Sequence, residues 1–186
     1  ANTRVVVYDA GDGRDATGAW FVLRFFGQEN VQVLNGGLRK WVEEKRPVTT
    51  TAGKAEKKNF APKPQADWVA TADWISKNGG KALLLDARSF NEYVGLDLLD
   101  NPRGGHLPGA VLLEWKQLGG AIEKGELVTF KSASEMQKVL QEKGVTKDKE
   151  IVTYCQVGLI RASVDYMALR KLGYEKVRLY VGSFED

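Results

Sequence analysis

The chain of 186 residues contains a single cysteine, Cys155, in a setting that suits a nucleophile. The apolar, β-branched run at 150–154 predicts a buried parallel strand, and 161–172 has helical spacing. Cys155 therefore lies where a strand ends and a helix follows, the edge at which open α/β sheets bind ligands. Backbone N–H groups of such a turn and the positive helix end favour anions there. The same field should stabilise a thiolate, the nucleophilic form of cysteine.

The residues after Cys155 strengthen this interpretation. Gly158 allows the backbone to turn tightly, and Arg161 supplies a permanent positive charge at the far end of the loop. A lone cysteine is more commonly a small buried apolar residue. The position at a strand end, the turn with Gly158 and the nearby Arg161 together favour a reactive thiol.

Composition excludes several other kinds of function. Hydrophobic residues make up 43% and charged residues 27%, as in ordinary soluble domains, and the net charge of +3 predicts no nucleic-acid partner. No window approaches the roughly 18 apolar residues of a membrane span, so no membrane partner is predicted. One cysteine and one histidine predict no disulfide framework and no zinc site, and we expect neither a metal nor a cofactor. No secretion signal precedes the first strand, which leaves cytoplasm and periplasm open.

Strands and helices alternate along most of the chain. The predicted strands cover 4–8, 31–34, 82–86, 110–113, 150–154 and 177–180, and the predicted helices cover 16–26, 38–44, 71–77, 89–93, 132–143 and 161–172. This alternation predicts an α/β fold, an open and mainly parallel sheet flanked by helices. The stretch 47–65 is rich in Thr, Lys, Gly and Pro without clear periodicity, which predicts a linker.

The two ends of the chain are copies of one another. Residues 4–40 align without a gap with residues 150–186 after a shift of 146 positions, and each copy predicts the same strand–turn–helix–strand unit. Asp9 stands at the position of Cys155, so the first copy cannot perform the same chemistry. The predicted division is therefore half of an inactive domain at 1–46, a linker at 47–65 and the catalytic domain at 66–186.

Residues 66–149 form a further half domain before the second copy and have no counterpart before Arg4. We therefore expect the chain to begin within its first repeat. A sheet left exposed in this way should be adhesive. The expected partner is the missing half domain or a second copy of the chain.

Four segments, in order along the chain, resemble motifs of the tandem rhodanese sulfurtransferases. Asp86-Ala-Arg88 resembles the family's Asp-x-Arg segment, and Gly105-His-Leu-Pro-Gly-Ala110 is similar to its Gly-His-Ile-Pro-Gly-Ala signature. Cys155-x-x-Gly158 followed by Arg161-Ala-Ser163 resembles the active-site loop, and Gly182-Ser-Phe-Glu-Asp186 resembles the terminal motif. The first copy looks like the matching half of a non-catalytic rhodanese domain.

This resemblance implies a rhodanese-like α/β fold and transfer of sulfur in two steps. The Cys155 thiolate takes the outer sulfur of a small anionic donor such as thiosulfate, and a thiophilic acceptor such as cyanide removes it from the persulfide. Arg161 and Ser163 would brace the loop, and Asp86 and Arg88 would form structural polar contacts beneath it. The anion and the persulfide would be held by backbone N–H groups of Gln156, Val157, Gly158, Leu159, Ile160 and Arg161.

The loop departs from the family pattern in length. It reads Cys-x5-Arg, whereas the usual rhodanese loop reads Cys-x4-Arg, and the longer form resembles that of rhodanese-fold phosphatases. A wider loop suits a tetrahedral phosphate, but Leu159 and Ile160 are apolar and the other motifs resemble sulfurtransferases. We therefore favour sulfur transfer. A phosphatase or arsenate reductase, and a persulfide carrier without turnover, stay as alternatives.

Two further positions bear on the donor and on catalysis. Mercaptopyruvate-type relatives have Cys-Gly and an added arginine where this chain has Gln156 and Glu92. A carboxylate at Glu92 would repel the carboxylate of mercaptopyruvate, so thiosulfate is the favoured donor. His106, the single histidine, is expected to fix a turn through a side-chain hydrogen bond rather than to act in catalysis.

Overall fold

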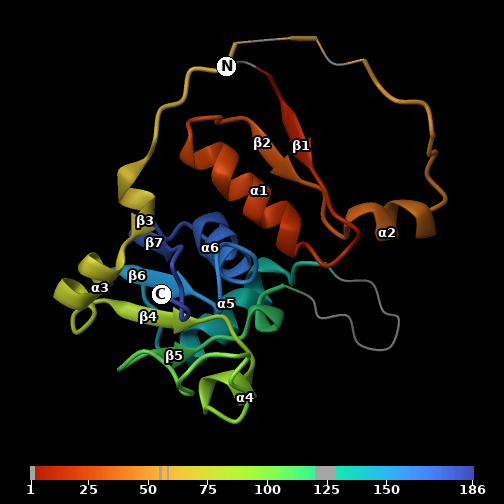
Figure 1. The fold of residues 1–186 in the computed structure, drawn as a ribbon. Helices are drawn as coiled ribbons and strands as arrows, with labels where there is room; N and C mark the ends of the chain where they lie inside the picture. Colours follow the sequence, from red (N-terminus) through yellow and green to blue (C-terminus); the bar gives the residue numbers. More distant parts are fainter. Residues whose placement is uncertain (1–2, 55, 58, 120–128) are drawn as a thin grey trace.

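The computed structural model describes residues 3–54, 56–57, 59–119 and 129–186. Residues 1–2, 55, 58 and 120–128, which fall within the three predicted segments, lie outside the described part. The chain contains two parallel sheets (Figure 1). The larger has the order β3 (Val69–Ala70), β7 (Val177–Tyr180), β6 (Ile151–Tyr154), β4 (Leu83–Asp86) and β5 (Val111–Leu112). The smaller pairs β1 (Val5–Val7) with β2 (Val31–Val33).

The strand that precedes Cys155, β6, is the central strand of the larger sheet. All four residues of β6 are buried, and they pair in register with β4 on one side and β7 on the other. A run of β-branched and apolar residues is what a strand covered on both faces requires. The carboxyl end of β6 is therefore held between two neighbours, which gives Cys155 a fixed starting position.

Helices cover the sheets close to their predicted positions. They are α1 (Arg14–Phe25), α2 (Gly37–Glu43), α3 (Ala72–Asn78), α4 (Phe90–Tyr93), α5 (Ala133–Glu142) and α6 (Ala162–Lys171), with 3-10 turns at Ala66–Trp68 and Trp115–Gln117. Ser89 and Ser132 begin α4 and α5 with capping boxes closed by Glu92 and Glu135. The predicted α/β class and the mainly parallel sheet are confirmed.

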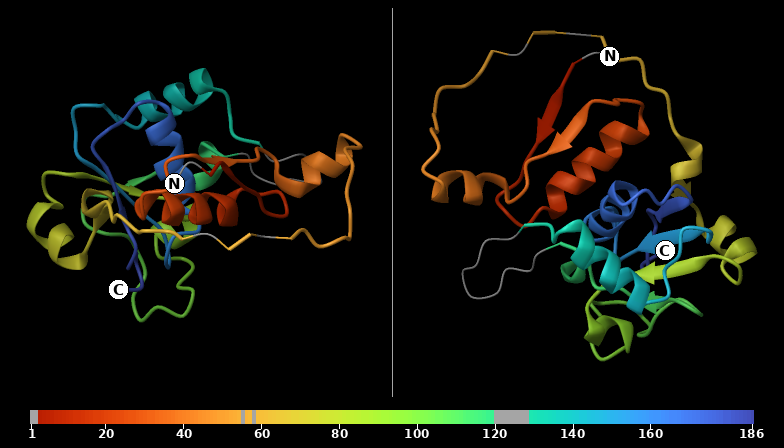
Figure 2. Two further views of the ribbon diagram at one scale, coloured as in Figure 1. Left: turned by 90° about the horizontal axis from the view of Figure 1, so that it is seen from above. Right: turned by 180° about the vertical axis from the view of Figure 1, so that it is seen from behind.

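The two copies meet through their equivalent helices. α1 and α6 lie side by side in both Figure 1 and Figure 2. The Oγ1 atom of Thr17 and the Oγ atom of Ser163, 146 residues apart, are 2.8 Å from each other. Each hydroxyl also lies within hydrogen-bond distance of the carbonyl oxygen three residues earlier in its own copy, at 2.9 and 3.1 Å, so one hydroxyl donates to that carbonyl and the other donates across the contact. Such a contact between equivalent positions is the geometry of a two-fold interface, here within one chain.

Aromatic residues extend this contact into a shared core. The ring of Phe21 on α1 meets the edge of Tyr166 on α6 at 4.9 Å between centroids. Arg24 and Arg170, another pair 146 residues apart, both lie over Trp68, at 5.7 and 5.1 Å from its ring. A single hydrophobic cluster runs from the first copy into the larger sheet. The division at 1–46, 47–65 and 66–186 stays a prediction; the described positions of 47–65 carry neither helix nor strand.

In the part of the chain that the structure describes, no helix is long and apolar enough to cross a bilayer. Within the same residues, no cluster of three or more His, Cys, Asp or Glu side chains is arranged to hold a metal ion.

The smaller sheet leaves apolar side chains in solvent. Val5 and Val7 of β1 pack toward the core, but Val6 is 49% exposed and Tyr8, just beyond the strand, is 60% exposed. α1 covers one face of this two-stranded sheet. Two-stranded sheets are marginal alone, and bare apolar faces promote association.

We expect the protein to self-associate through this face. Light scattering should give a mass that rises with concentration, and a Val6→Lys/Tyr8→Lys double variant should lower it, because the added charges oppose burial of the face. A mass equal to one chain at every concentration, for the unsubstituted protein, would contradict this expectation.

A buried carboxyl lies in the first turn of α6. Asp165 is fully buried, and neither of its oxygens has a partner among the described residues. Burial, reinforced by the negative charges of Asp86 and Glu114, raises the pKa of the Asp165 carboxyl well above its usual value of 3.8. The folded protein therefore holds Asp165 protonated over a pH range in which the unfolded chain ionises it.

Stability should consequently fall as pH rises from about 4 through the raised pKa of folded Asp165. The variant Asp165→Asn has no ionisable group at this position. It should match the unsubstituted protein in acid and exceed its free energy of unfolding at pH 8, as measured by urea denaturation at a series of pH values. A difference between the two proteins that does not vary with pH would rule out this account.

Candidate active site

Cys155 lies directly after β6 on the floor of a cleft of roughly 500 Å³. Its Sγ atom is 3.6 Å from the carbonyl oxygen of Val157 and 3.8 Å from that of Gly158, so the loop curls around the sulfur. Gly158 adopts a φ of +60°, a left-handed conformation that glycine tolerates without strain. The predicted loop residues Gln156, Val157, Ile160 and Arg161 all line this cleft.

The backbone of the loop carries unused hydrogen-bond donors. The N–H groups of Ser163 and Val164 donate to the carbonyls of Leu159 and Arg161. Within the described part of the chain, the N–H groups of residues 156–162 donate to no protein acceptor. They belong to the loop that follows Cys155 and to the start of α6, a setting suited to an anion.

The equivalent loop of the first copy binds a carboxylate of its own chain. There, the carboxylate of Asp9 accepts hydrogen bonds from the N–H groups of Gly11 at 2.9 Å and Ala16 at 3.1 Å. The shift of 146 positions relates these two donors to Val157 and Ala162. The loop of the first copy is thus occupied by its own carboxylate, whereas among the described residues the equivalent donors of the second copy have no protein acceptor.

Arg161 fastens the loop to α4. Its two terminal nitrogens bind the two carboxylate oxygens of Glu92 at 2.6 and 2.8 Å. Burial by itself would raise the pKa of the Glu92 carboxyl, but hydrogen bonds from Arg161 and Ser89 lower it to about 2. Glu92, expected to repel a carboxylate, is therefore paired with a positive charge.

The remaining predicted loop-support residues lie beneath the cleft and do not line it. Asp86 and Arg88 form a buried pair with 2.7 Å between Oδ2 and Nη2. Tyr154 donates to the same carboxylate at 2.7 Å, and Arg88 donates to the carbonyl of Gly105, also at 2.7 Å. This network is satisfied on both sides, which a buried ion pair requires.

His106 makes the expected side-chain hydrogen bond. Its Nδ1 lies 2.8 Å from the carbonyl oxygen of Tyr93, and its ring stacks on that of Tyr93 at 3.7 Å. It is not among the residues that line the cleft.

Ser183 is a site residue that sequence reasoning missed. Its Oγ accepts a hydrogen bond from the N–H of Cys155 at 3.2 Å and lies 3.9 Å from Sγ. Its φ of +62° is unusual for a residue with a side chain, and its counterpart in the first copy is Gly37, with φ +56°. In both copies the next residue donates to the carbonyl of residue 9 or 155. The sequence signal that could have identified Ser183 is its place in the repeat, where the first copy has Gly37.

Other cleft residues carried no sequence signal, because they come from separate segments. Trp115 and Lys116 come from a 3-10 turn after β5. Arg14 comes from the first copy, at the start of α1.

We expect Ser183→Gly and Ser183→Ala to slow alkylation of Cys155 by iodoacetamide to a similar extent, because both remove the hydroxyl beside the sulfur. The glycine variant should be about 1 kcal/mol more stable than the alanine variant, because alanine retains the left-handed backbone strain. Alkylation rates and urea denaturation test both statements. An alanine variant as stable as the glycine variant would show that the backbone at 183 is unstrained.

Comparison with known proteins agrees with this geometry. The family model named rhodanese-like domain matches residues 1–44 and 71–186. A thiosulfate sulfurtransferase of Azotobacter vinelandii is 35% identical over 183 residues, which cover 97% of this chain and 65% of that protein. The sulfur carrier protein TtuD of Thermus thermophilus is 34% identical over 199 residues, which cover 100% of this chain and 68% of that protein.

A solved structure gives the same result in three dimensions. The crystal structure of SseA from Escherichia coli, described with the rhodanese fold and mechanism of 3-mercaptopyruvate sulfotransferases, matches with a TM-score of 0.82 at 29% identity. The match covers 99% of this chain and 68% of SseA, so the chain spans about two thirds of the length of these relatives. From the family match, the fold and the loop around its cysteine, the chain belongs to the rhodanese-like family.

Proposed function

We propose that this protein is a thiosulfate sulfurtransferase that carries the transferred sulfur as a persulfide on Cys155. The observation that carries the proposal is the set of unused N–H donors in the loop that follows Cys155, which itself lines an open cleft. A donor set of this kind stabilises both an anionic substrate and an anionic persulfide, and it does so without reorganisation during the reaction.

In the first step, the Cys155 thiolate attacks the outer sulfur of thiosulfate. A bond forms between Sγ and that sulfur, the sulfur–sulfur bond of thiosulfate breaks, and its electron pair leaves with sulfite. The donors of residues 156–162 hold the anion as it approaches, and then hold the terminal sulfur of the persulfide.

In the second step, a thiophilic acceptor such as cyanide attacks the terminal sulfur. The new carbon–sulfur bond gives thiocyanate, and the Sγ–S bond breaks to regenerate the Cys155 thiolate. The sulfur changes partners twice and no outside oxidant or reductant is consumed. Ser183, which bonds the Cys155 N–H and lies beside Sγ, would keep the sulfur aligned through both steps.

The position of Arg161 argues against hydrolysis of phosphate esters. In a Cys-x5-Arg phosphatase, the arginine must offer its nitrogens to the phosphate oxygens. Here each terminal nitrogen of Arg161 donates one hydrogen bond to Glu92, so two of the five N–H groups that a phosphate would use are already bound within the protein. The relatives named for thiosulfate sulfurtransferase and 3-mercaptopyruvate sulfotransferase activity also support sulfur transfer.

Two points concern the donor and the extent of turnover. The pairing of Glu92 with Arg161 weakens the repulsion expected for mercaptopyruvate, so thiosulfate should be compared directly with it. The relative named as a sulfur carrier protein keeps a persulfide carrier as the second candidate. Such a carrier would gain one sulfur on Cys155 without releasing thiocyanate at a catalytic rate.

The protein should produce thiocyanate from thiosulfate and cyanide, and Cys155→Ser should reduce production to the buffer rate, because oxygen cannot form the persulfide. Mass spectrometry after thiosulfate alone should show a gain of one sulfur atom on Cys155. An aryl phosphate and mercaptopyruvate serve as comparison substrates in the same assay.

The outcomes separate the candidates. Cysteine-dependent phosphate release would place the protein among the phosphatases, and faster turnover of mercaptopyruvate would change the donor. A gain of sulfur without turnover would favour the carrier. A Cys155 that gains no sulfur and resists alkylation would remove the proposal.

A further inference from the structure

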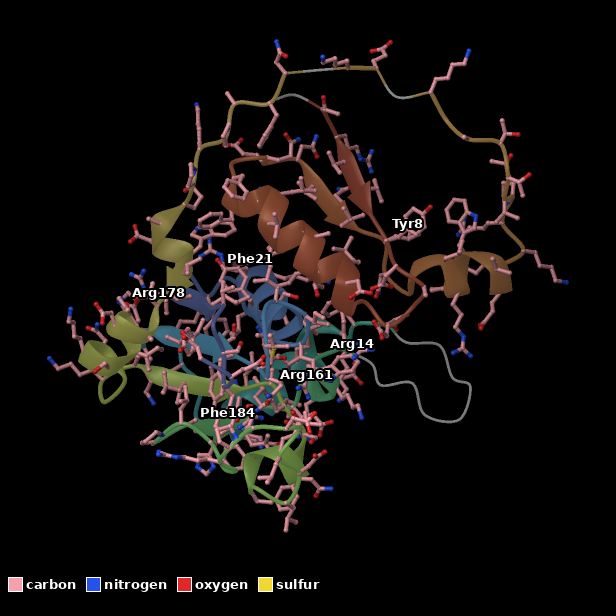
Figure 3. All side chains as sticks on the ribbon, viewed as in Figure 1. Tyr8, Arg14, Phe21, Arg161, Arg178 and Phe184 are labelled. Atoms are coloured by element: carbon pink, nitrogen blue, oxygen red, sulfur yellow. The ribbon has the colours of Figure 1, made fainter. Side chains whose placement is uncertain are left out.

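One residue of the cleft lining belongs to the first copy, which has no cysteine. Arg14 stands at the start of α1 and lines the cleft together with Cys155, Arg161 and Trp115. In Figure 3, Arg14 lies at the lower end of α1 and Arg161 lies below it. The contact between α1 and α6 brings the starts of both helices to this cleft, since Arg14 is the counterpart of Ile160 in the repeat.

The guanidinium of Arg14 is held on one edge only. Asp12 accepts from Nε at 2.8 Å and from Nη2 at 2.5 Å, and the guanidinium carbon lies 5.2 Å from the ring centre of Trp115. Within the described residues, Nη1 has no hydrogen-bond partner, and the side chain is 41% exposed. The group is thus oriented by a carboxylate and an aromatic ring, with one amino group left for another acceptor.

The other cations that line the cleft are differently engaged. Arg161 directs both terminal nitrogens to Glu92, and Lys116 is paired with Glu114, at 3.4 Å. Three cationic and two acidic residues line the cleft, and Asp12, which binds Arg14 from outside this lining, balances the remaining charge. Arg14 is the arginine of this set whose terminal nitrogens are not both bound by a carboxylate.

Thiosulfate carries negative charge at both ends, and the two ends must contact different parts of the cleft. The outer sulfur must reach Sγ at the floor of the cleft, while the sulfonate end extends away from it and departs as sulfite with both charges. The loop N–H groups serve the first end. A positive group on the cleft wall would serve the second, and its effect is largest where charge accumulates on the leaving group.

We propose that Arg14 binds the sulfonate end of the donor and the departing sulfite, so that the copy without a cysteine selects the donor for the copy that has one. This assignment deepens the proposed sulfur transfer and rests on it. The class of ligand is a sulfane donor with an anionic sulfonate group, of which thiosulfate is the smallest.

The test compares Arg14→Gln with the matched control Arg4→Gln. The control removes the same charge from an exposed position just before β1, outside the residues that line the cleft. Arg14→Gln should lower kcat/KM for thiosulfate about tenfold, the effect of losing one charge-assisted hydrogen bond. In a two-step transfer, kcat/KM for cyanide reports the second step alone, so it should change less than about twofold. Arg4→Gln should change neither value, and Arg14→Lys should recover part of the loss.

A binding measurement keeps this test independent of turnover. In the Cys155→Ser background, titration calorimetry should show that Arg14→Gln raises the Kd for thiosulfate about tenfold. An inactive unsubstituted protein would overturn the proposed function, and the calorimetry would still decide the role of Arg14. An unchanged Kd, equal losses for thiosulfate and cyanide, or a lysine variant as impaired as the glutamine variant would each overturn the assignment.

Discussion

The contact between α1 and α6 holds the two copies together. Two buried hydroxyl groups, Thr17 and Ser163, meet at 2.8 Å, and around them the aromatic rings of Phe21 and Tyr166 join the copies into a single hydrophobic cluster. The two residues are equivalent in the repeat, so the contact resembles a two-fold interface enclosed in one chain. It also brings the start of each helix to the same cleft, so the packing of the two helices determines which residues line it.

Within this frame, equivalent loops serve two purposes. In the first copy the loop closes on its own carboxylate, Asp9, whose two oxygens satisfy two backbone donors. In the second copy a cysteine replaces the carboxylate, and the equivalent donors have no protein acceptor. The exchange of Gly37 for Ser183 accompanies this change, and Ser183 keeps the left-handed backbone while its hydroxyl reaches Cys155. Strain retained at a functional position is a familiar cost of placing a polar group where it is needed.

Most charged side chains around the cleft are held in ion pairs. Arg161 and Glu92 neutralise one another and fasten the loop to α4, so the loop arginine acts as a brace. The buried pair of Asp86 and Arg88 fixes the segment beneath it in the same way. Ion pairs of this kind fix the positions of the segments they join more than they stabilise the fold, because the cost of desolvation offsets much of the Coulomb energy. Attraction for an anionic donor is then left to backbone dipoles and to side chains with an unbound edge.

The sequence by itself determined the α/β class, the helices and every strand except β3 to within a few residues, and the repeat with its shift of 146, because strand and helix periodicity are local properties. It also placed Cys155 at a strand end, since the apolar run of β6 stops there. Only the tertiary structure decided that Arg161 faces Glu92, that Ser183 reaches Cys155 and that Arg14 enters the cleft. These contacts join residues far apart in the chain. They depend on the order of parallel strands and on the packing of two helices, and no local pattern in the sequence records either of them.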